Sequence, residues 1–306
     1  MSALEDAAAF WYEGKNGARL RAAIYWPAGR ARGGVVLSPG RTEFIEKYRP
    51  VVDELLSRGF AVVTHDWRGQ GLSDRMLPAE PLKGHATTSE LFLQDYALLL
   101  AQAERRGLPR PWIGMGHSMG GALTLLAHLD RLGDFAAVVL SAPMLGVKLS
   151  MPAWFAGAMA DTRCLLGQAE AYARGASDPW AETFADNEVT HDEVCWRRTH
   201  DMLMAHRELA LGSPTWGWVR FALKSSAEIR RRAHELKGRP AELRIVAAGD
   251  DRLADTEAAR QVARAADTLD QFTIVEHAFH EVLMETSTRR GVFWREFEVL
   301  AARLTT

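Results

Sequence analysis

A serine flanked by glycines is the first feature of this sequence that could carry chemistry. Residues 116–121 read Gly-His-Ser-Met-Gly-Gly, so Ser118 lies in a Gly-x-Ser-x-Gly pattern. An apolar run that starts at Trp112 precedes the pattern, and apolar residues at helical spacing follow it as far as Leu129. A strand, this pattern and a helix together form the sharp turn that exposes a nucleophilic serine at a sheet edge. We therefore predict that Ser118 is a catalytic nucleophile.

The partners of such a serine should lie further along the chain. A serine hydroxyl attacks only when a base removes its proton, so Ser118 needs a histidine that is oriented by a carboxylate. Candidates follow two later apolar runs, in the order serine, acid, histidine that this kind of site uses. The candidate acids are Asp250, Asp251 and Asp255, and the candidate bases are His277 and His280. Asp255 precedes a helical stretch that it would also cap. The spacing alone leaves both choices open.

Two other interpretations of chemistry-bearing residues are weaker. Gly114 and Gly116 begin a dinucleotide-binding pattern, but Met119 stands where the third glycine belongs. The histidines and cysteines near residue 200 follow no standard zinc spacing. They are His191, Cys195, His200 and His206. We therefore expect no cofactor and no metal.

The elements that must position these residues alternate along the chain. We expect strands over 9–13, 18–27, 33–38, 60–65, 112–115, 136–141, 243–248 and 271–275. We expect helices over 45–57, 88–106, 122–129, 256–266 and 287–303. The first two strands are joined by a glycine-containing turn and should form an antiparallel hairpin. The remaining alternation predicts an α/β fold, with a mostly parallel eight-stranded sheet flanked by helices.

This alternation stops between residues 146 and 227. The stretch has no run of β-branched residues and holds half of the tryptophans, namely Trp154, Trp180, Trp196, Trp216 and Trp218. We expect a helical cap at 146–227, inserted into a core formed by 1–145 and 228–306. Its tryptophans and methionines either pack inside the cap or line an apolar pocket for a fatty chain, and composition does not decide between these roles.

Composition limits the classes of partner. The chain has 306 residues, a net charge of -2 and no basic block, which argues against a nucleic-acid partner. Residues 1–10 lack the basic start and apolar core of a signal peptide, and no apolar run is long enough to span a bilayer. Two cysteines suggest a reducing compartment. We expect a cytoplasmic protein with peripheral contact at the inner face of the membrane, in an oligomeric state that composition does not predict.

Several motifs together resemble those of a known family. They are Ser38-Pro39-Gly40-Arg41-Thr42-Glu43, Asp66-Trp67-Arg68-Gly69-Gln70-Gly71-Leu72-Ser73, Gly116-His117-Ser118-Met119-Gly120-Gly121, Ala142-Pro143-Met144, Asp251-Arg252-Leu253-Ala254-Asp255 and Phe279-His280-Glu281. Over nearly its full length the chain resembles the monoacylglycerol lipase and lysophospholipase family of α/β-hydrolases. It looks most similar to the bacterial inner-membrane lysophospholipases.

The resemblance implies specific roles. It assigns the nucleophile to Ser118, the acid to Asp251, the base to His280, and the oxyanion hole to the backbone N–H groups of Arg41 and Met119. The implied activity is hydrolysis of carboxylic esters in single-chain lipids such as lysophospholipids or monoacylglycerols. A short-chain esterase, a thioesterase or an acyltransferase would use the same three residues, and a non-catalytic binding protein would have lost some of them.

The residue before the oxyanion position separates the branches of the family. Monoacylglycerol lipases carry His-Gly there, whereas this chain has Pro39-Gly40 followed by Arg41. The lysophospholipase branch looks similar to the Pro-Gly-Arg version. The planar guanidinium of Arg41 could pair with a phosphate, or it could form an ion pair with Glu43 or Glu46. The sequence leaves these two roles open.

Overall fold

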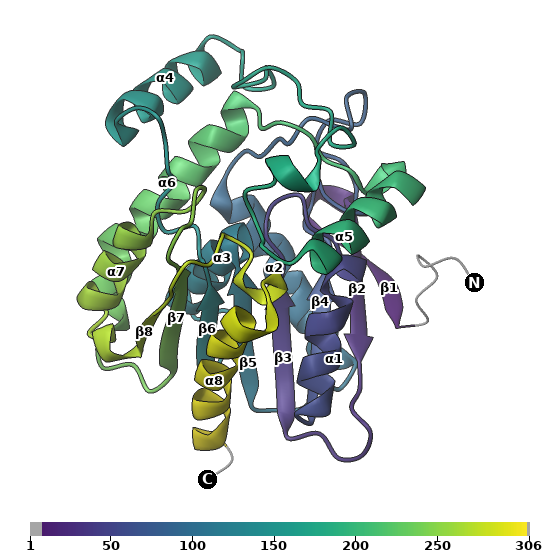
Figure 1. The fold of residues 1–306 in the computed structure, drawn as a ribbon, viewed down its shortest axis with the longest axis vertical. Coiled ribbons are helices and arrows are strands. Elements are labelled where there is room, and N and C mark those ends of the chain that lie inside the picture. The colour runs from purple at the N-terminus through teal and green to yellow at the C-terminus, as the bar shows by residue number, and fades with distance from the viewer. Residues whose placement is uncertain (1–7, 305–306) are drawn as a thin grey trace.

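An eight-stranded sheet runs through the middle of the molecule (Figure 1). The structure is a computed structural model that describes residues 8–304. Most of the 1–10 stretch, on which the expectation of no signal peptide rests, lies outside the described residues. The strand order is β1-β2-β4-β3-β5-β6-β7-β8. The strands are β1 (Ala9–Glu13), β2 (Arg19–Tyr25), β3 (Gly33–Ser38), β4 (Phe60–His65), β5 (Trp112–His117), β6 (Ala137–Ser141), β7 (Glu242–Ala248) and β8 (Phe272–Val275).

The register of the sheet confirms the expected mixture of strand directions. Strand β1 pairs with β2 in an antiparallel hairpin, and β2 pairs antiparallel with β4. Every pair from β4 to β8 is parallel. All residues of β3, β4, β5 and β6 are buried, because helices cover both faces of a parallel sheet. The carboxyl ends of the parallel strands therefore share one edge.

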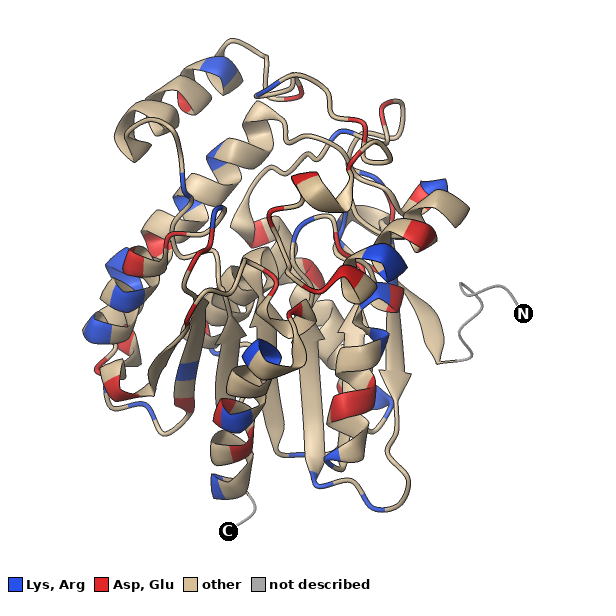
Figure 2. Ribbon diagram, viewed as in Figure 1, with Lys and Arg blue, Asp and Glu red and all other residues tan. Residues whose placement is uncertain are grey.

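Two apolar cores lie on the two faces of the sheet. One core packs α1 (Arg49–Ser57) and α8 (Ser287–Arg303) against it through residues such as Val52 and Phe297. The other packs α2 (Ser89–Arg105), α3 (Ser118–Leu129), α6 (Trp216–Arg232) and α7 (Thr256–Ala265) through residues such as Tyr96 and Leu123. Figure 2 shows charged residues gathered on the outer helices and loops, while most of the sheet lacks them.

The helix expected over 45–57 is divided in two. Residues Ile45–Tyr48 form a 3₁₀ turn, η2, and the α-helix α1 begins only at Arg49. Pro50, in the first turn of α1, has no N–H and cannot bond to the carbonyl of Glu46 four residues earlier. The Arg49 N–H instead bonds to that carbonyl three residues back, as in a 3₁₀ turn. The expectation of one continuous helix was therefore wrong.

Residues 146–227 contain helices joined by irregular chain. They are α4 (Ala153–Leu165), α5 (Glu193–Ala205) and the first turns of α6, with the short turns η3 (Phe184–Asp186) and η4 (Arg207–Leu209) between them. Figure 1 shows α4 and α5 beyond the carboxyl ends of the parallel strands. Position 227 falls inside α6, which packs on α3 and α7 of the core as well as on α4. Across residues 8–304, no helix is long and apolar enough to span a membrane.

Ionisable side chains are also buried around the sheet. Burial lowers the pKa of His65 to about 3. Burial, together with nearby Arg239, lowers the pKa of His128 to about 4. Burial raises the pKa of Asp66 to about 6, even though Arg21 opposes the shift. These groups therefore hold a different number of protons in the folded chain than in the unfolded chain between pH 4 and pH 6.

Candidate active site

Ser118 stands at the turn between β5 and α3. Its φ angle of 51° lies in the left-handed region that side chains other than glycine rarely adopt. The turn is closed by glycines on both sides. A Cβ on Gly116 would lie 2.7 Å from the Gly120 carbonyl oxygen, and one on Gly120 would collide with the carbonyl oxygens of Ser38 and Pro39. This strained turn presents the hydroxyl of Ser118 at the carboxyl edge of the sheet.

His280 and Asp251 reach Ser118 from the loops after β8 and β7. The Nε2 atom of His280 lies 2.8 Å from Ser118 Oγ, and its Nδ1 atom lies 2.7 Å from Asp251 Oδ2. An ionised carboxylate only accepts hydrogen bonds, so Nδ1 carries the proton and Nε2 is free to accept one. The structure therefore brings together the three residues that the resemblance assigns.

Asp251 is held as a buried carboxylate. It is 1% exposed, and its Oδ1 accepts the backbone N–H groups of Leu253 at 2.8 Å and Ala254 at 2.9 Å. Burial raises the pKa of this carboxyl, but the hydrogen bond from His280 and the two backbone bonds outweigh burial and hold the pKa below its ordinary value. Asp251 consequently stays ionised and fixes the orientation of the imidazole.

The competing candidates lie elsewhere. His277 and Asp250 face each other across 3.4 Å at the surface, with side chains 78% and 55% exposed. Asp255 caps α7 by accepting the backbone N–H groups of Glu257 and Ala258. None of these three side chains forms a hydrogen bond with Ser118 or His280 among the residues that the structure describes. Among the acids and bases that the spacing left open, only Asp251 and His280 are thus placed by the fold beside Ser118.

The loop that carries Arg41 is clamped by one side chain. The Nε2 atom of Gln70 donates to the carbonyl oxygen of Gly40 at 2.9 Å, and its Oε1 accepts the N–H of Thr42 at 3.0 Å. The peptides on both sides of Arg41 are therefore held by the same buried amide. Since the Gly40 carbonyl and the Arg41 N–H belong to one planar peptide, fixing the carbonyl also fixes the direction of the N–H.

Two further side chains hold the same loop. Glu43 Oε2 accepts the N–H of Gly40 and, at 2.6 Å, the hydroxyl of Tyr48. Trp67 Nε1 donates to the carbonyl oxygen of Pro39 at 2.7 Å. The other donor that the resemblance assigns is the N–H of Met119, in the first turn of α3, where backbone N–H groups have no intrahelical partner. Such amides can hold a negative oxygen.

A buried ionic cluster joins the Arg41 loop to the His280 loop. Lys47 Nζ lies 2.9 Å from Glu43 and 2.5 Å from Glu281, the residue after His280. Burial disfavours charge here, but the neighbouring carboxylates raise the pKa of Lys47 above its ordinary value. Lys47 and nearby His117 lower the pKa of Glu43 to about 2 against the effect of burial. The cluster fixes both loops without carrying chemistry of its own.

His117 adds a second imidazole below His280. The ring centroids of His117 and His280 are 4.8 Å apart, and His117 Nδ1 donates to the carbonyl oxygen of Ser141 at 3.1 Å. Burial lowers the pKa of His117 to about 4, even though Glu43 opposes the shift. His117 is therefore neutral at physiological pH and does not repel a proton on His280.

Ser118 and His280 open into a large cavity beneath the inserted helices. Its volume is about 880 Å³, within the range of small-molecule sites. Val147, Trp218 and Leu223 form part of its apolar wall. Trp196 also lines the cavity, whereas Trp154 is 75% exposed on the outside of α4. The tryptophans of the insertion thus divide between pocket wall and outer surface.

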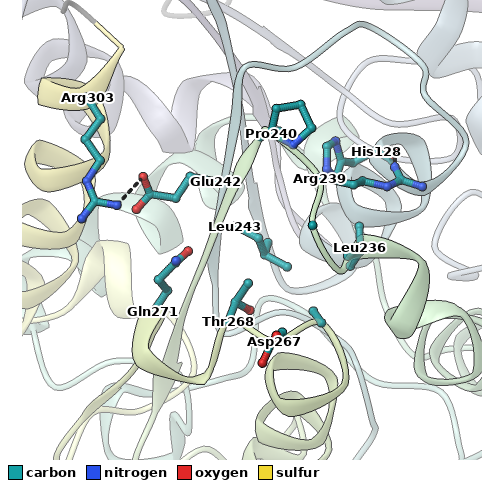
Figure 3. A pocket seen from close by; sticks show the side chains of 13 residues that line it. His128, Leu236, Arg239, Pro240, Glu242, Leu243, Asp267, Thr268, Gln271 and Arg303 are labelled. Atoms are coloured by element: carbon teal, nitrogen blue, oxygen red, sulfur yellow. Dashed lines mark hydrogen bonds and ion pairs between the residues drawn. The ribbon is translucent and has the colours of Figure 1, made fainter.

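A second cavity of about 310 Å³ lies at the opposite edge of the sheet, near the start of β7 (Figure 3). Its charged groups are engaged within the protein. Arg239 donates to the carbonyl oxygen of His128 at 2.6 Å, and Arg303 pairs with Glu242 at 3.0 Å. No base next to a nucleophile is found among the residues that line it. This cavity therefore offers no second catalytic arrangement.

The histidines of the insertion have structural partners. His191 Nδ1 lies 2.6 Å from the buried carboxylate of Glu285, and His200 stacks on Trp196. Within residues 8–304, no three histidine, cysteine, aspartate or glutamate side chains are grouped as metal ligands would be.

The chain is similar in sequence to known hydrolases. Residues 29–287 match the family described as serine aminopeptidase, S33. The chain is 31% identical to lysophospholipase L2 of Escherichia coli K12 over 271 residues, covering 84% of this chain and 77% of that protein. It is 30% identical to a monoacylglycerol lipase of Mycolicibacterium smegmatis over 132 residues, covering 43% and 45% of the two chains.

Solved structures share the fold. A soluble variant of monoglyceride lipase from Saccharomyces cerevisiae, in complex with a substrate analog, superimposes with a TM-score of 0.74. The match covers 97% of this chain and 95% of that one at 17% identity. A monoacylglycerol lipase from Paleococcus ferrophilus gives a TM-score of 0.69 over 92% and 98% of the two chains, at 18% identity.

Proposed function

We propose that this chain, which belongs to the serine aminopeptidase, S33 family of α/β-hydrolases and is a lipid ester hydrolase, cleaves single-chain lipids. The proposed catalytic residues are Ser118, His280 and Asp251. The substrate class is a lysophospholipid or a monoacylglycerol. The observation that carries the proposal is the hydrogen-bonded series from Ser118 through His280 to Asp251, opening into an apolar-walled cavity.

The geometry supports an acyl-enzyme mechanism. His280 Nε2 removes the Ser118 proton as Oγ attacks the ester carbonyl, and Asp251 stabilises the imidazolium that forms. The tetrahedral oxyanion is held by the N–H groups of Arg41 and Met119, and each such donor typically lowers the barrier by about 3 kcal/mol. His280 then protonates the leaving alcohol, and a water molecule activated by the same histidine releases the fatty acid.

Residues 146–227 act in this proposal as a cap over the acyl site. Support comes from the cavity, whose lining combines Ser118 and His280 with residues of the insertion, including Trp196, Trp218 and Leu203. An apolar wall of this kind suits a fatty chain. A short-chain esterase would share the same catalytic residues but would show no preference for long acyl chains, whereas a thioesterase would cleave a thioester and an acyltransferase would pass the acyl group to an acceptor other than water.

The outside of the cap suggests peripheral contact with a membrane. Trp154, Phe155, Leu165 and Leu166 on and beside α4 have side chains 48–85% exposed. Figure 2 shows few charged residues on α4. Exposed tryptophan, phenylalanine and leucine side chains favour the boundary between lipid headgroups and acyl chains. Co-sedimentation with phospholipid vesicles that weakens in Trp154→Ser would support this contact, and a protein that stays in the supernatant would contradict it.

Ester hydrolysis by wild type and Ser118→Ala tests the proposed activity. The substrates are p-nitrophenyl esters from acetate to palmitate, with lysophosphatidylcholine and monoacylglycerol beside them. We expect a preference for long single chains, and a loss of turnover in Ser118→Ala without a change in melting temperature, because the small alanine side chain fits the same turn. Wild-type turnover in Ser118→Ala would refute the role of Ser118, and activity confined to short esters would refute the lipid substrate.

A further inference from the structure

The guanidinium of Arg41 has no acidic partner among the residues that the structure describes. Of the two carboxylates that the sequence offered, Glu43 pairs with Lys47 and Glu46 pairs with Arg21. No carboxylate among residues 8–304 forms an ion pair with Arg41, and burial alone lowers the pKa of its guanidinium, to about 10. The side chain is thus still a cation at neutral pH, but its charge is not neutralised by the protein.

The contacts of the guanidinium hold it in place without neutralising it. Its Nη2 donates to the backbone carbonyl of Gly212 in the cap, and its central carbon lies 5.1 Å from the ring centre of Trp218. Its Nε is buried and has no hydrogen-bond partner among the described residues. Gly84 makes room for it, since a Cβ there would collide with the guanidinium. The arginine is therefore fixed but incompletely bonded.

This cation lines the same cavity as Ser118. Keeping a buried charge unpaired is costly, so an anion that enters the cavity gains an interaction that the empty site lacks. The planar fork of arginine donors matches the oxygens of a phosphate group. The cavity thus joins an ester-cleaving serine to a site suited to an anionic phosphate.

The chemistry of the substrate fits the length of one arginine. In an arginine, a certain number of covalent bonds leads from the backbone nitrogen to the guanidinium carbon. The same number of bonds leads from the ester carbonyl carbon of a 1-acyl lysophospholipid to its phosphorus. With the carbonyl oxygen at the N–H of Arg41, the glycerol backbone can run alongside the arginine side chain. We propose that the Arg41 guanidinium binds the headgroup phosphate, which makes lysophospholipids, rather than monoacylglycerols, the preferred substrates. The inference rests on the proposed ester hydrolysis at Ser118.

The test compares two substrates that share an acyl chain and differ in the phosphate. The kcat/KM for palmitoyl lysophosphatidylcholine is divided by the kcat/KM for 1-monopalmitoylglycerol, so that any general effect on the oxyanion loop cancels. We expect a ratio above one in wild type and a fall of about ten- to a hundredfold in Arg41→Gln, the range for hydrogen bonds to charged groups. Arg41→Lys, which keeps the charge but loses the fork, should fall between them.

Arg75→Gln is the matched control. Arg75 also donates to backbone carbonyls of the cap, those of Glu208 and Ala210, a few residues before Gly212, but it does not line the cavity. Its ratio should remain that of wild type. An unchanged ratio in Arg41→Gln, or an equal fall in Arg75→Gln, would overturn the inference and leave the ester hydrolysis standing. Wild type that cleaves neither palmitoyl substrate would refute the proposed function itself.

Two further measurements separate the lipid headgroup from free phosphate and do not depend on the chemical step. Lysophosphatidylcholine should bind Ser118→Ala more tightly than the double variant with Arg41→Gln, as measured by calorimetry below micelle concentrations. Equal affinity would contradict the inference. Inorganic phosphate should inhibit wild-type hydrolysis of 1-monopalmitoylglycerol much less than glycerophosphocholine does, because only the latter fills the positions of both the glycerol and the phosphate. Stronger inhibition by inorganic phosphate would assign the site to the free anion and overturn the headgroup proposal.

Discussion

Replacing Gln70 with glutamate should disable the proposed oxyanion hole without touching the catalytic residues. The introduced carboxylate keeps an acceptor for the Thr42 N–H but replaces the donor to the Gly40 carbonyl with a second acceptor. Two oxygens held 2.9 Å apart repel each other, so the peptide between Gly40 and Arg41 should rotate and withdraw the Arg41 N–H. The oxyanion would then lose one of its two donors.

The expected magnitude follows from that single donor. Loss of one oxyanion-hole hydrogen bond raises the barrier by about 3 kcal/mol, so kcat should fall by roughly 10² to 10³. KM should change little, because the bond forms mainly in the transition state. Steady-state hydrolysis of a p-nitrophenyl ester measures both constants. A boronic acid inhibitor, which forms a tetrahedral adduct with serine, should lose affinity in parallel with kcat.

The pH profile distinguishes a positioning role from simple damage. Below the pKa of the introduced carboxyl, its protonated oxygen can again donate to the Gly40 carbonyl, so the activity of Gln70→Glu relative to wild type should recover as the pH falls. Gln102→Glu is the matched control, since Gln102 lies on α2 and does not line the cavity. If folded Gln70→Glu keeps its kcat within about threefold of wild type, the clamp does not orient the Arg41 amide.

Two further predictions follow from the same structure. Asp251→Asn should lower kcat by roughly 10⁴, because an amide oriented to donate opposes the Nδ1–H tautomer, whereas Asp250→Asn at the exposed pair should leave ester hydrolysis near wild type; equal losses on p-nitrophenyl esters would refute the assignment. The stability of the fold should also depend on pH. Three buried histidines bind a proton near pH 6.5 in the unfolded chain but only near pH 3 to 4 in the folded chain. The free energy of unfolding should therefore fall as the pH drops from about 6 to 4.5. Asp66 opposes this change, since burial raises its folded pKa to about 6, but it accounts for one proton against three from the histidines, so the free energy of unfolding still falls. Urea denaturation at several pH values measures the slope, and a flat profile would contradict it; the histidines involved are His65, His117 and His128.

The fold was predictable where the local pattern of apolar residues and glycines matches the place of the segment in the folded chain. The strand expected over 60–65 has the same bounds as β4, and β5 and α3 follow the apolar pattern around Ser118 closely. Buried parallel strands are continuous apolar runs, and glycines mark the turn beside them, so both signals are local. The 45–57 helix shows the limit of periodicity, because the apolar spacing continued through Pro50 while the backbone bonding did not.

The site was predictable only in part. Spacing supplied Ser118 and a short list of acids and bases, but it did not separate Asp251 from Asp250, since adjacent residues in a loop differ only in where the fold directs them. The clamp by Gln70 was missed, although its position between two glycines of a loop was visible in the sequence. The contact between Lys47 and Glu281 joins residues 234 positions apart, and no local pattern encodes it.

Helix α6 has a consequence for how this chain can acquire new substrates. Over about 25 Å it reaches from the cavity wall at Trp218 to the layer where it packs on α3, the helix that begins at Ser118. The chain between Leu149 and Pro214 consists of loops and short helices, but Val189 and His191 bond it to Glu281 and Glu285 in the loop that carries His280. The helix cannot be exchanged with it, since a change in its tilt would move the floor of the reaction centre. A foreign lid for a new substrate should therefore leave α6 in place and keep the contacts of Val189 and His191 with the His280 loop and of Gly212 with Arg41.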